Sequence, residues 1–364
     1  MPFSPDELTR YQRHLSLAGF GAEAQEKLQR GSVLVIGAGG LGCPALLYLV
    51  AAGVGRVVIV DDDRVDLSNL QRQVLYATED AGEPKAEAAA RRLRALNPLI
   101  AIEPRGERFT RANALALVRD VEVVLDGSDN FATRYLVNDA CVLADRPFVY
   151  GAIQGFEGQV SVFNWRGGPT YRCLFPEPPA PGTVPNCADA GVLGVLPGLI
   201  GAAQACEAIK LLTGIGEPLA GKLFFLDALT LRTQLVALEA DPRSREIREL
   251  PHEGYGAMCA LPLDHSEEVD VADLRAALAN GSPPQLVDVR ESWERALGAI
   301  EPSVHVPLGE LQQQGAPGLD PLAPTVVYCA VGARSLLAAR VLRERHGFRA
   351  VASLRDGFRA WRQK

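Results

Sequence analysis

The stretch Ser32-Val-Leu-Val-Ile36 is an apolar run that leads directly into the glycine-rich turn Gly37-Ala-Gly-Gly-Leu-Gly42. The run is short enough for a buried strand, and a helix-like segment follows the glycines as far as Ala52. A second apolar strand, Arg56–Val60, then ends at Asp61. Such a unit predicts a nucleotide site, because the glycines let the backbone approach a phosphate at a helix N-terminus and the acid can bind ribose hydroxyls. This unit alone fits NAD, FAD or ATP.

The alternation of strands and helices continues beyond this unit. Apolar runs at 100–103 and 121–125 alternate with helix-like segments at 84–96, 112–119 and 132–144. This spacing predicts an α/β fold with a mostly parallel, Rossmann-like doubly wound sheet. Further strands are expected at 148–153, 159–164, 222–226 and 231–238, with a small-residue helix at 196–212 and an irregular proline-rich loop at 167–189.

The length of 364 residues allows two domains. We predict a first domain at 1–245, a linker at 246–268 and a smaller α/β domain at 269–364. Asp-Pro, Gly-Tyr-Gly and Leu-Pro breaks interrupt any periodicity near the linker.

Composition narrows the class of protein. A hydrophobic content of 48% and a charged content of 22% are typical of a soluble globular protein, and a net charge of −7 argues against nucleic acid as the main partner. Seven scattered cysteines favour a reducing cytoplasm, and Met1–Glu7 lacks the features of a signal peptide. Gly31–Gly55 carries no charge, but its glycines and Pro44 fit a buried strand–helix unit better than a membrane span.

Polar and charged residues follow Asp61 closely. Asn69, Arg72 and Gln73 come next along the chain, and Lys85 lies at the start of the next helix. Cations near a glycine turn suit a triphosphate such as that of ATP, because its displaced phosphate groups carry more negative charge than the pyrophosphate bridge of a dinucleotide. Singly, each residue could be a helix cap, a surface ion pair or a solvated side chain. Together with the glycines they favour ATP.

Two acids, Asp126 and Asp129, follow the strand at 121–125. The carboxyl ends of strands are the edge where α/β sheets bind ligands. A carboxylate there could hold magnesium together with phosphates and water.

Six segments give the first 240 residues a specific resemblance. They are Arg10-Tyr-Gln-Arg-His14, Gly37-Ala-Gly-Gly-Leu-Gly42, Asp66-Leu-Ser-Asn-Leu-Gln-Arg-Gln73, Gly82-Glu-Pro-Lys85, Asp126-Gly-Ser-Asp-Asn130 and Gly158-Gln-Val-Ser-Val-Phe163. On these segments the chain closely resembles the MoeB/ThiF family, bacterial relatives of ubiquitin-activating enzymes. The resemblance implies an enzyme that binds ATP and Mg²⁺ and adenylates the C-terminal glycine of a ubiquitin-like sulfur-carrier protein ending in Gly-Gly.

The resemblance also implies roles for individual residues. By matching position, Gly40 and Asp61 bind adenosine, and Asp129 lies at the magnesium and reaction centre. Arg13 resembles the family arginine that reaches the partner's ATP across a dimer interface, so a homodimer is implied. The full set of expected nucleotide-binding residues is Arg13, Gly37, Gly39, Gly40, Gly42, Asp61, Ser68, Asn69, Leu70, Gln71, Arg72, Lys85, Asp129 and Asn130.

The resemblance to the same family also bears on Cys173 and Cys187. MoeB-like proteins usually hold a structural zinc on two Cys-x-x-Cys pairs, which here fall at Thr170 and Cys173 and near 241–246. Only Cys173 remains, so no structural zinc is expected. Cys187, in the proline-rich loop, resembles the cysteine that forms a covalent intermediate with the carrier in some relatives. The alternative is a bystander thiol in a loop.

Cys329 lies in the loop Cys329-Ala-Val-Gly-Ala-Arg334, between a predicted strand and a predicted helix. Loop N–H groups and a helix N-terminus would stabilise a thiolate or a persulfide, and Arg334 adds a charge. With Val287-Asp-Val-Arg-Glu291 and Asp356-Gly-Phe-Arg-Ala-Trp361, residues 269–364 resemble a rhodanese domain. A cysteine phosphatase is disfavoured, because four residues rather than five separate Cys329 from Arg334.

The two resemblances lead to one hypothesis: the chain activates a carrier as an acyl-adenylate and then supplies sulfur from a Cys329 persulfide, giving a thiocarboxylate for molybdopterin biosynthesis or a related pathway. Thiosulfate or a cysteine desulfurase persulfide would be the sulfur donor. The expected catalytic residues are Arg72, Lys85, Asp129, Cys187, Cys329 and Arg334. The alternatives are an NAD-dependent oxidoreductase on the Rossmann-like half and a non-catalytic adaptor that docks carriers.

Overall fold

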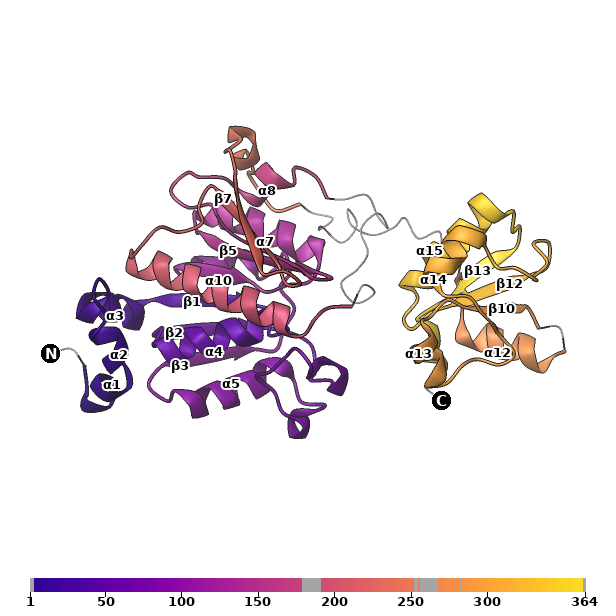
Figure 1. The fold of residues 1–364 in the computed structure, drawn as a ribbon, viewed down its shortest axis with the longest axis horizontal. Helices are drawn as coiled ribbons and strands as arrows, with labels where there is room; N and C mark the ends of the chain where they lie inside the picture. Colours follow the sequence, from indigo (N-terminus) through magenta and orange to yellow (C-terminus); the bar gives the residue numbers. More distant parts are fainter. Residues whose placement is uncertain (1–2, 179–190, 252–254, 256–267, 282, 363–364) are drawn as a thin grey trace. The chain divides into compact units, whose positions relative to one another are not determined.

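A computed structural model of the chain describes residues 3–178, 191–251, 255, 268–281 and 283–362. The chain divides into two compact units, Met1–Cys259 and Ala260–Lys364, and Figure 1 labels the elements of both. We describe each unit by itself.

The first unit contains one mixed sheet of eight strands. Their order is β3-β2-β1-β4-β5-β6-β7-β8, with parallel pairing from β3 to β5 and antiparallel pairing from β5 to β8. The strands are β1 (Ser32–Ile36), β2 (Arg56–Val60), β3 (Ala101–Arg105), β4 (Val123–Asp126), β5 (Phe148–Gln154), β6 (Glu157–Phe163), β7 (Lys222–Asp227) and β8 (Arg232–Ala237). The parallel half confirms the predicted doubly wound sheet.

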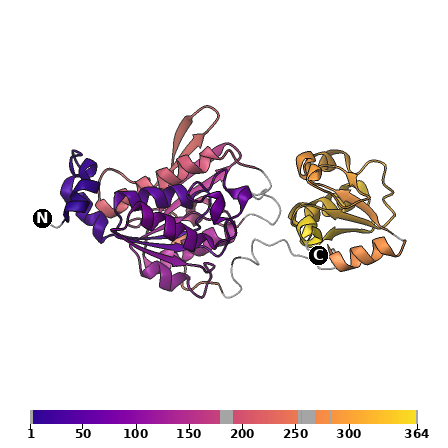
Figure 2. The same ribbon diagram turned by 90° about the horizontal axis from the view of Figure 1, so that it is seen from below.

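Helices cover both faces of this sheet (Figure 2). The described helices of this unit are α1 (Pro5–Arg10), α2 (Gln12–Leu15), α3 (Gly21–Arg30), α4 (Gly42–Ala52), α5 (Lys85–Leu96), α6 (Ala114–Arg119), α7 (Phe131–Ala144), α8 (Tyr171–Leu174) and α10 (Val195–Thr213). Val33 and Val35 of β1 belong to the core that contains α3, α4, α5 and α10, while Leu34 and Ile36 belong to the core that contains α6 and α7. The alternation follows from the period of two along a strand.

The uncharged stretch Gly31–Gly55 forms β1, the glycine turn and α4, as predicted. Among the described residues, one helix is long and apolar enough to cross a membrane, namely α10. Half of its apolar window is buried, and it contacts α4, β5 and β6. The buried Gln204 of α10 donates to the carbonyl of Asp126 at 2.7 Å, as expected of a helix in a protein core.

The second unit contains a parallel sheet with the strand order β11-β10-β12-β13-β9. Its strands are β9 (Glu268–Val269), β10 (Gln285–Asp288), β11 (Val304–His305), β12 (Thr325–Tyr328) and β13 (Val351–Leu354). Its helices are α12 (Val271–Ala279), α13 (Ser292–Ala296), α14 (Leu308–Gln314), α15 (Ala333–His346) and α16 (Gly357–Arg362). Residues of α14 and α15 pack on one face of the sheet, and residues of α12 and α16 on the other.

The segment predicted as a linker, 246–268, contains packed residues. Leu250 and Tyr255 are buried in the core of the first unit, and the Tyr255 hydroxyl donates to Asp139. Glu268 already belongs to β9 of the second unit. The predicted domain boundaries stay a prediction, but Leu250 and Tyr255, both beyond residue 245, pack in the first unit.

Candidate functional site

A cavity of about 750 Å³ lies in the first unit at the carboxyl ends of β1, β2 and β4. The structure brings many of the predicted nucleotide-binding residues to its wall, namely Gly37, Gly39, Gly40, Asp61, Asn69, Gln71, Arg72, Lys85, Asp129 and Asn130. Gly42, Ser68 and Leu70 do not line it. Arg13 is exposed on α2 and does not line it either.

The glycine turn brings two backbone segments close together beneath the cavity. Gly37 has a φ of +89°, and a Cβ there would lie 2.9 Å from the carbonyl oxygen of Gly127. A Cβ on Gly42 would lie 1.9 Å from the carbonyl oxygen of Gly37. Gly42 therefore closes the turn and is needed for the site even though it does not line the cavity.

Asp61 is held by the backbone on both sides. Its carboxylate accepts hydrogen bonds from the N–H groups of Ala38 and Asp63, each at 2.8 Å. Burial raises the pKa of Asp61, and the charge of Lys85 opposes that rise. Since each carboxylate oxygen has more than one acceptor position, Asp61 keeps capacity for a ligand hydroxyl.

Lys85 points its ammonium group at an acid that the sequence prediction did not single out. Its Nζ lies 2.9 Å from Oδ2 of Asp63, and the Lys85 side chain is 6% exposed whereas that of Asp63 is 67% exposed. Both residues line the cavity. The only sequence signal for Asp63 was its place just after the strand that ends at Asp61, so the pairing itself could not be foreseen.

Arg72 and Gln73 share one acceptor, Oδ1 of Asn69. The Arg72 guanidinium donates to it at 2.8 Å and the Gln73 amide at 3.3 Å. Asn69 ends the 3₁₀ helix η1 (Leu67–Asn69), whose start is capped by the side chain of Asp66. The segment after Asp61 thus carries its own scaffold, which fixes the cation Arg72 at the cavity wall.

The two acids after β4 have different environments. Asp129 is exposed, lines the cavity and forms no hydrogen bond or ion pair with another described residue. Its free carboxylate fits a magnesium ion, which prefers one or two carboxylates together with phosphate oxygens and water. Asp126 is fully buried and accepts from the N–H and hydroxyl of Ser128 at 3.0 and 2.6 Å. Burial raises the pKa of Asp126, and its hydrogen bonds with Ser128 tie it to the loop that follows β4.

Arg134 of α7 was missed by the sequence prediction. It is 7% exposed, lines the cavity, and places its guanidinium 5.6 Å from the ring centres of Phe131 and Tyr150. The charge of Arg134 opposes the raised pKa of Asp126. Arg134 lies four residues after Asn130, about one turn into α7. This spacing puts it near the predicted site residues Asp129 and Asn130, and could have identified it from the sequence.

Cys173 contacts Thr170, Asp241 and Ser244, which lie at or near the positions where zinc ligands were expected. Its Sγ accepts from the backbone N–H groups of Thr170 and Asp241, each at 3.3 Å, and lies 3.2 Å from Oγ of Ser244. Burial would raise the pKa of Cys173, but the hydrogen bonds of Ser244, Asp241 and Thr170 outweigh it and lower that pKa. The Asp241 carboxylate is bound to Arg243 at 2.9 Å. Since tetrahedral structural zinc needs four thiolate or imidazole ligands, these residues do not fit the ion.

Cys187 lies outside the described residues. Cys329, the other predicted nucleophile, directly follows β12 in the second unit and is fully buried. Its Sγ accepts from the N–H of Gly332 at 3.1 Å and from the hydroxyl of Ser335 at 3.5 Å. Gly332 is the N-cap of α15 and has a φ of +101°, so the loop turns sharply at the helix N-terminus.

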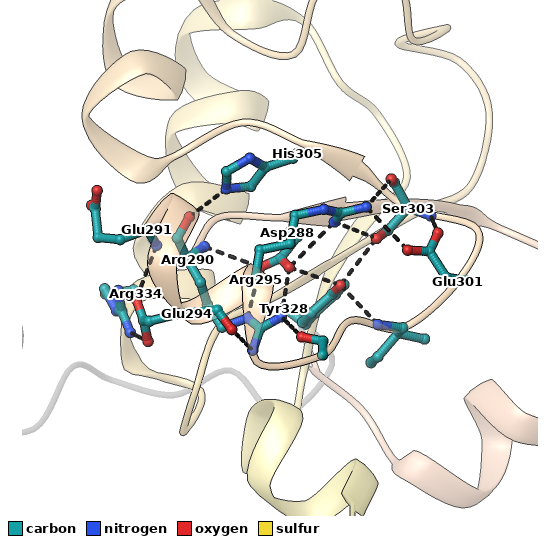
Figure 3. A network of polar contacts seen from close by, with 12 residues as sticks. Asp288, Arg290, Glu291, Glu294, Arg295, Glu301, Ser303, His305, Tyr328 and Arg334 are labelled. Atoms are coloured by element: carbon teal, nitrogen blue, oxygen red, sulfur yellow. Dashed lines mark hydrogen bonds and ion pairs between the residues drawn. The ribbon is translucent and has the colours of Figure 1, made fainter. Parts of the chain in front are cut away.

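Arg334, expected to add a positive charge to the Cys329 loop, forms an ion pair with an acid. Figure 3 shows its guanidinium directed at Glu294 of α13, and the two hydrogen bonds are both 2.7 Å long. Burial would raise the pKa of Glu294, but the hydrogen bonds from Arg334 lower it. The Arg334 charge is therefore balanced locally, and Arg334 ties the loop to α13.

A buried polar network fixes the end of β12, the strand that directly precedes Cys329. Figure 3 shows Asp288 between Arg290 and Tyr328. Asp288 accepts from the Arg290 guanidinium at 2.7 and 2.9 Å and from the Tyr328 hydroxyl at 3.0 Å. Since Tyr328 directly precedes Cys329, this network fixes the position from which the loop begins.

Comparisons with known proteins agree with the arrangement of both units. Residues 11–246 match the ThiF family, and residues 270–364 match the rhodanese-like domain. The chain is 53% identical over 270 residues to a sulfur carrier protein adenylyltransferase of Thermus thermophilus, covering 72% of this chain and all of the relative. It is 42% identical to the probable adenylyltransferase/sulfurtransferase MoeZ of Mycobacterium tuberculosis, covering 98% of this chain and 93% of the relative.

A more distant relative is the adenylyltransferase and sulfurtransferase MOCS3 of Sus scrofa, with 41% identity over 93% of this chain and 81% of the relative. Among solved structures, E. coli MccB has a TM-score of 0.58 at 22% identity, covering 66% of this chain and 74% of that chain, which shows a shared fold. Because residues 11–246 match the ThiF family and residues 270–364 match the rhodanese-like domain, the chain belongs to the ThiF family and carries a rhodanese-like domain on its C-terminal side.

Proposed function

We propose that this chain adenylates the C-terminal glycine of a ubiquitin-like sulfur-carrier protein and then converts that carboxylate to a thiocarboxylate. The observation that carries the proposal is the presence, in one chain, of a cavity lined by Lys85, Arg72 and Asp129 and of a loop in which the N–H of Gly332 donates to the Cys329 sulfur. Relatives that match nearly the whole chain are named for both activities.

In the first reaction, a carrier carboxylate oxygen attacks the α-phosphorus of ATP. The bond from that phosphorus to the bridging oxygen breaks, and pyrophosphate leaves. Lys85 and Arg72 stabilise the charge that develops on the leaving group, and no general base is required because the nucleophile is already ionised. For Lys85 to reach a phosphate, its ammonium group exchanges part of its contact with Asp63 for the ligand.

Magnesium, when bound, neutralises phosphate charge, and Asp129 is the residue that we propose to hold it. Asp61 and Gly40 would bind the adenosine. We further propose a homodimer in which Arg13 completes the partner's site. At the Cys173 corner, hydrogen bonds would take the place of a structural zinc.

In the second reaction, the Cys329 thiolate takes the outer sulfur of thiosulfate and releases sulfite, or takes sulfur from a cysteine desulfurase persulfide. The outer persulfide sulfur attacks the acyl carbon and AMP leaves, which gives an acyl disulfide. A thiol then attacks Sγ of Cys329, and the electron pair leaves with the carrier thiocarboxylate. That thiol is a dithiol reductant. Cys187 stays a proposed site of covalent attachment to the carrier.

The test separates the two activities by substitution. Lys85→Ala should lower carrier-dependent ATP–pyrophosphate exchange about 100-fold or more while thiosulfate sulfurtransferase activity is kept. Cys329→Ala should abolish sulfurtransferase activity and leave exchange unchanged. If either substitution removed both activities from a folded protein, the proposed division would be wrong. Exchange that persists in Lys85→Ala would remove Lys85 from the phosphate site.

A further inference from the structure

The N-terminal end of α16 is hydrogen-bonded to the backbone of the loop that begins at Cys329. The N–H of Phe358 donates to the carbonyl of Cys329 at 2.7 Å, and the N–H of Arg359 donates to the carbonyl of Ala330 at 3.0 Å. Two successive loop carbonyls are therefore directed at α16, a helix that the sequence places about thirty residues further along the chain.

This attachment has a consequence for the N–H groups of the loop. In a trans peptide unit the carbonyl and the following N–H point in opposite directions. Because the carbonyls of Cys329 and Ala330 point at α16, the N–H groups of Ala330 and Val331 point away from it. The next N–H, that of Gly332, donates to the Cys329 sulfur at 3.1 Å. The N–H of Gly332 thus contacts the sulfur directly, and those of Ala330 and Val331 would be available to the outer sulfur of a negatively charged persulfide.

Gly357 is the residue that allows α16 to come this close. It has a φ of +59°, and a Cβ there would lie 2.4 Å from the carbonyl oxygen of Cys329 and 2.8 Å from both the carbonyl carbon of Ala330 and the nitrogen of Val331. All three atoms belong to the loop backbone, so no flexible side chain could give way. Any side chain at 357 must displace the loop or detach α16.

We propose that Gly357 is a positioning residue for sulfur transfer: it seats α16 against the Cys329 loop, so that the loop N–H groups face the persulfide. The proposal rests on the sulfurtransferase function proposed above. Gly357 touches no reacting atom and acts through the loop backbone. Displacing the loop should weaken the stabilisation of negative charge on the outer sulfur during transfer.

The test compares Gly357→Ala with Gly347→Ala. Gly347 follows α15 in the same unit and also has a positive φ, +75°, but a Cβ there would meet nothing within 4 Å. Both substitutions impose a left-handed alanine, and only one meets the loop. The measurements are kcat and KM for sulfur transfer from thiosulfate to cyanide, and the fraction of Cys329 converted to persulfide, from peptide masses.

Gly357→Ala should lower kcat about 10- to 100-fold and lower the persulfide fraction, since small displacements of reacting groups cost rates of that order. Gly347→Ala should stay within about twofold of the unmodified protein, the order expected for a change that meets no neighbour. Equal kcat and persulfide fraction in the two variants would overturn the proposal. If the unmodified protein itself transferred no sulfur from thiosulfate, the proposed function would fail instead.

A measurement on the unmodified protein covers the case in which Gly357→Ala does not fold. Residue-resolved amide hydrogen exchange is recorded before and after the full chain is treated with thiosulfate. The amides of Ala330, Val331 and Gly332 should exchange more slowly once the persulfide has formed, while those of Phe358 and Arg359 should be protected in both states. Unchanged exchange at Ala330 and Val331, or rapid exchange at Phe358, would contradict the proposal.

Discussion

At the scale of single residues, the charged groups of both sites are organised by acids close to the predicted cations. Lys85 meets Asp63 and Arg334 meets Glu294, each at hydrogen-bonding distance. The cations could be predicted from their place in a motif. Their partners could not, because ion pairing depends on side-chain positions, and Glu294 lies forty residues before Arg334.

The Glu294–Arg334 pair predicts a pH-dependent contribution to stability. The pKa of Glu294 is lowered in the folded state from an ordinary value of 4.5. The pair should therefore stabilise the second unit fully above pH 4.5, and this contribution should be lost as pH falls through the lowered folded pKa. Glu294→Gln should cost about 1–3 kcal/mol at neutral pH, since Arg334 loses a charged acceptor.

Thermal unfolding of the full chain and of Glu294→Gln, followed by the fluorescence of Trp293 and Trp361 of the second unit against that of Trp165, measures this effect. The difference between the proteins should be constant from pH 7 to 6 and should shrink below pH 4.5. A difference that stays the same down to pH 3 would mean that the Glu294 charge contributes nothing.

At the scale of elements, the Cys173 corner joins α8 to the 3₁₀ helix η3 (Pro242–Arg245). Sulfur ligands of tetrahedral zinc lie about 3.8 Å apart when each Zn–S distance is about 2.3 Å. The 3.2 Å from Cys173 Sγ to Ser244 Oγ and 3.6 Å to Thr170 Oγ1 are close to that separation. Two separations in the corner are thus close to those between zinc ligands, in line with our proposal that hydrogen bonds take the place of the metal there.

We expect the melting temperature of the unmodified protein to be insensitive to EDTA. The combined variant Thr170→Cys, Asp241→Cys and Ser244→Cys should bind one zinc ion per chain, melt at a higher temperature with zinc, and lose that gain in EDTA. The matched control keeps Ser244 and changes only the other two positions. Stoichiometric zinc in the unmodified protein, purified from zinc-containing medium, would contradict this account.

Most elements of the fold could be predicted from the sequence, and the exceptions are short. The strands and helices of the Rossmann-like half were placed within a few residues, because their apolar periods are long and regular. The four-residue helix α8 was predicted as irregular loop, and α13, α14 and β11 were not predicted. These segments are stabilised by contacts distant in sequence, such as that of Tyr171 N–H with Asn138 at 2.8 Å, which no local pattern encodes.

At the scale of the whole molecule, the nucleotide cavity is built by residues far apart in the chain, from Ile36 to Tyr255. Tyr255 lies in the segment predicted as linker, yet it is buried, stacks on Tyr135 and donates to Asp139. The sequence offered no signal for this contact, because the surrounding breaks in periodicity indicate a linker. Arg13 does not line the cavity of its own chain, which leaves its expected role dependent on a second copy.

The proposed dimer predicts rescue between two inactive variants. If Arg13 acts in the partner's site, Arg13→Ala and Lys85→Ala should each lose pyrophosphate exchange alone. A mixed dimer has one complete site, with Lys85 from one protomer and Arg13 from the other. After subunit exchange, activity should return to about a quarter of the unmodified level, as half of the dimers are mixed and each has one working site. No recovery in demonstrably mixed dimers would place Arg13 outside the partner's site.

The most direct test of the central claim is the mass of a Gly-Gly-ended sulfur carrier after incubation with the full chain, ATP, Mg²⁺, thiosulfate and a dithiol. The account predicts that one oxygen of the carrier is replaced by sulfur, that the change needs ATP, and that it is absent with Lys85→Ala or Cys329→Ala. An unchanged carrier mass in the presence of intact Cys329 and measurable pyrophosphate exchange would contradict it.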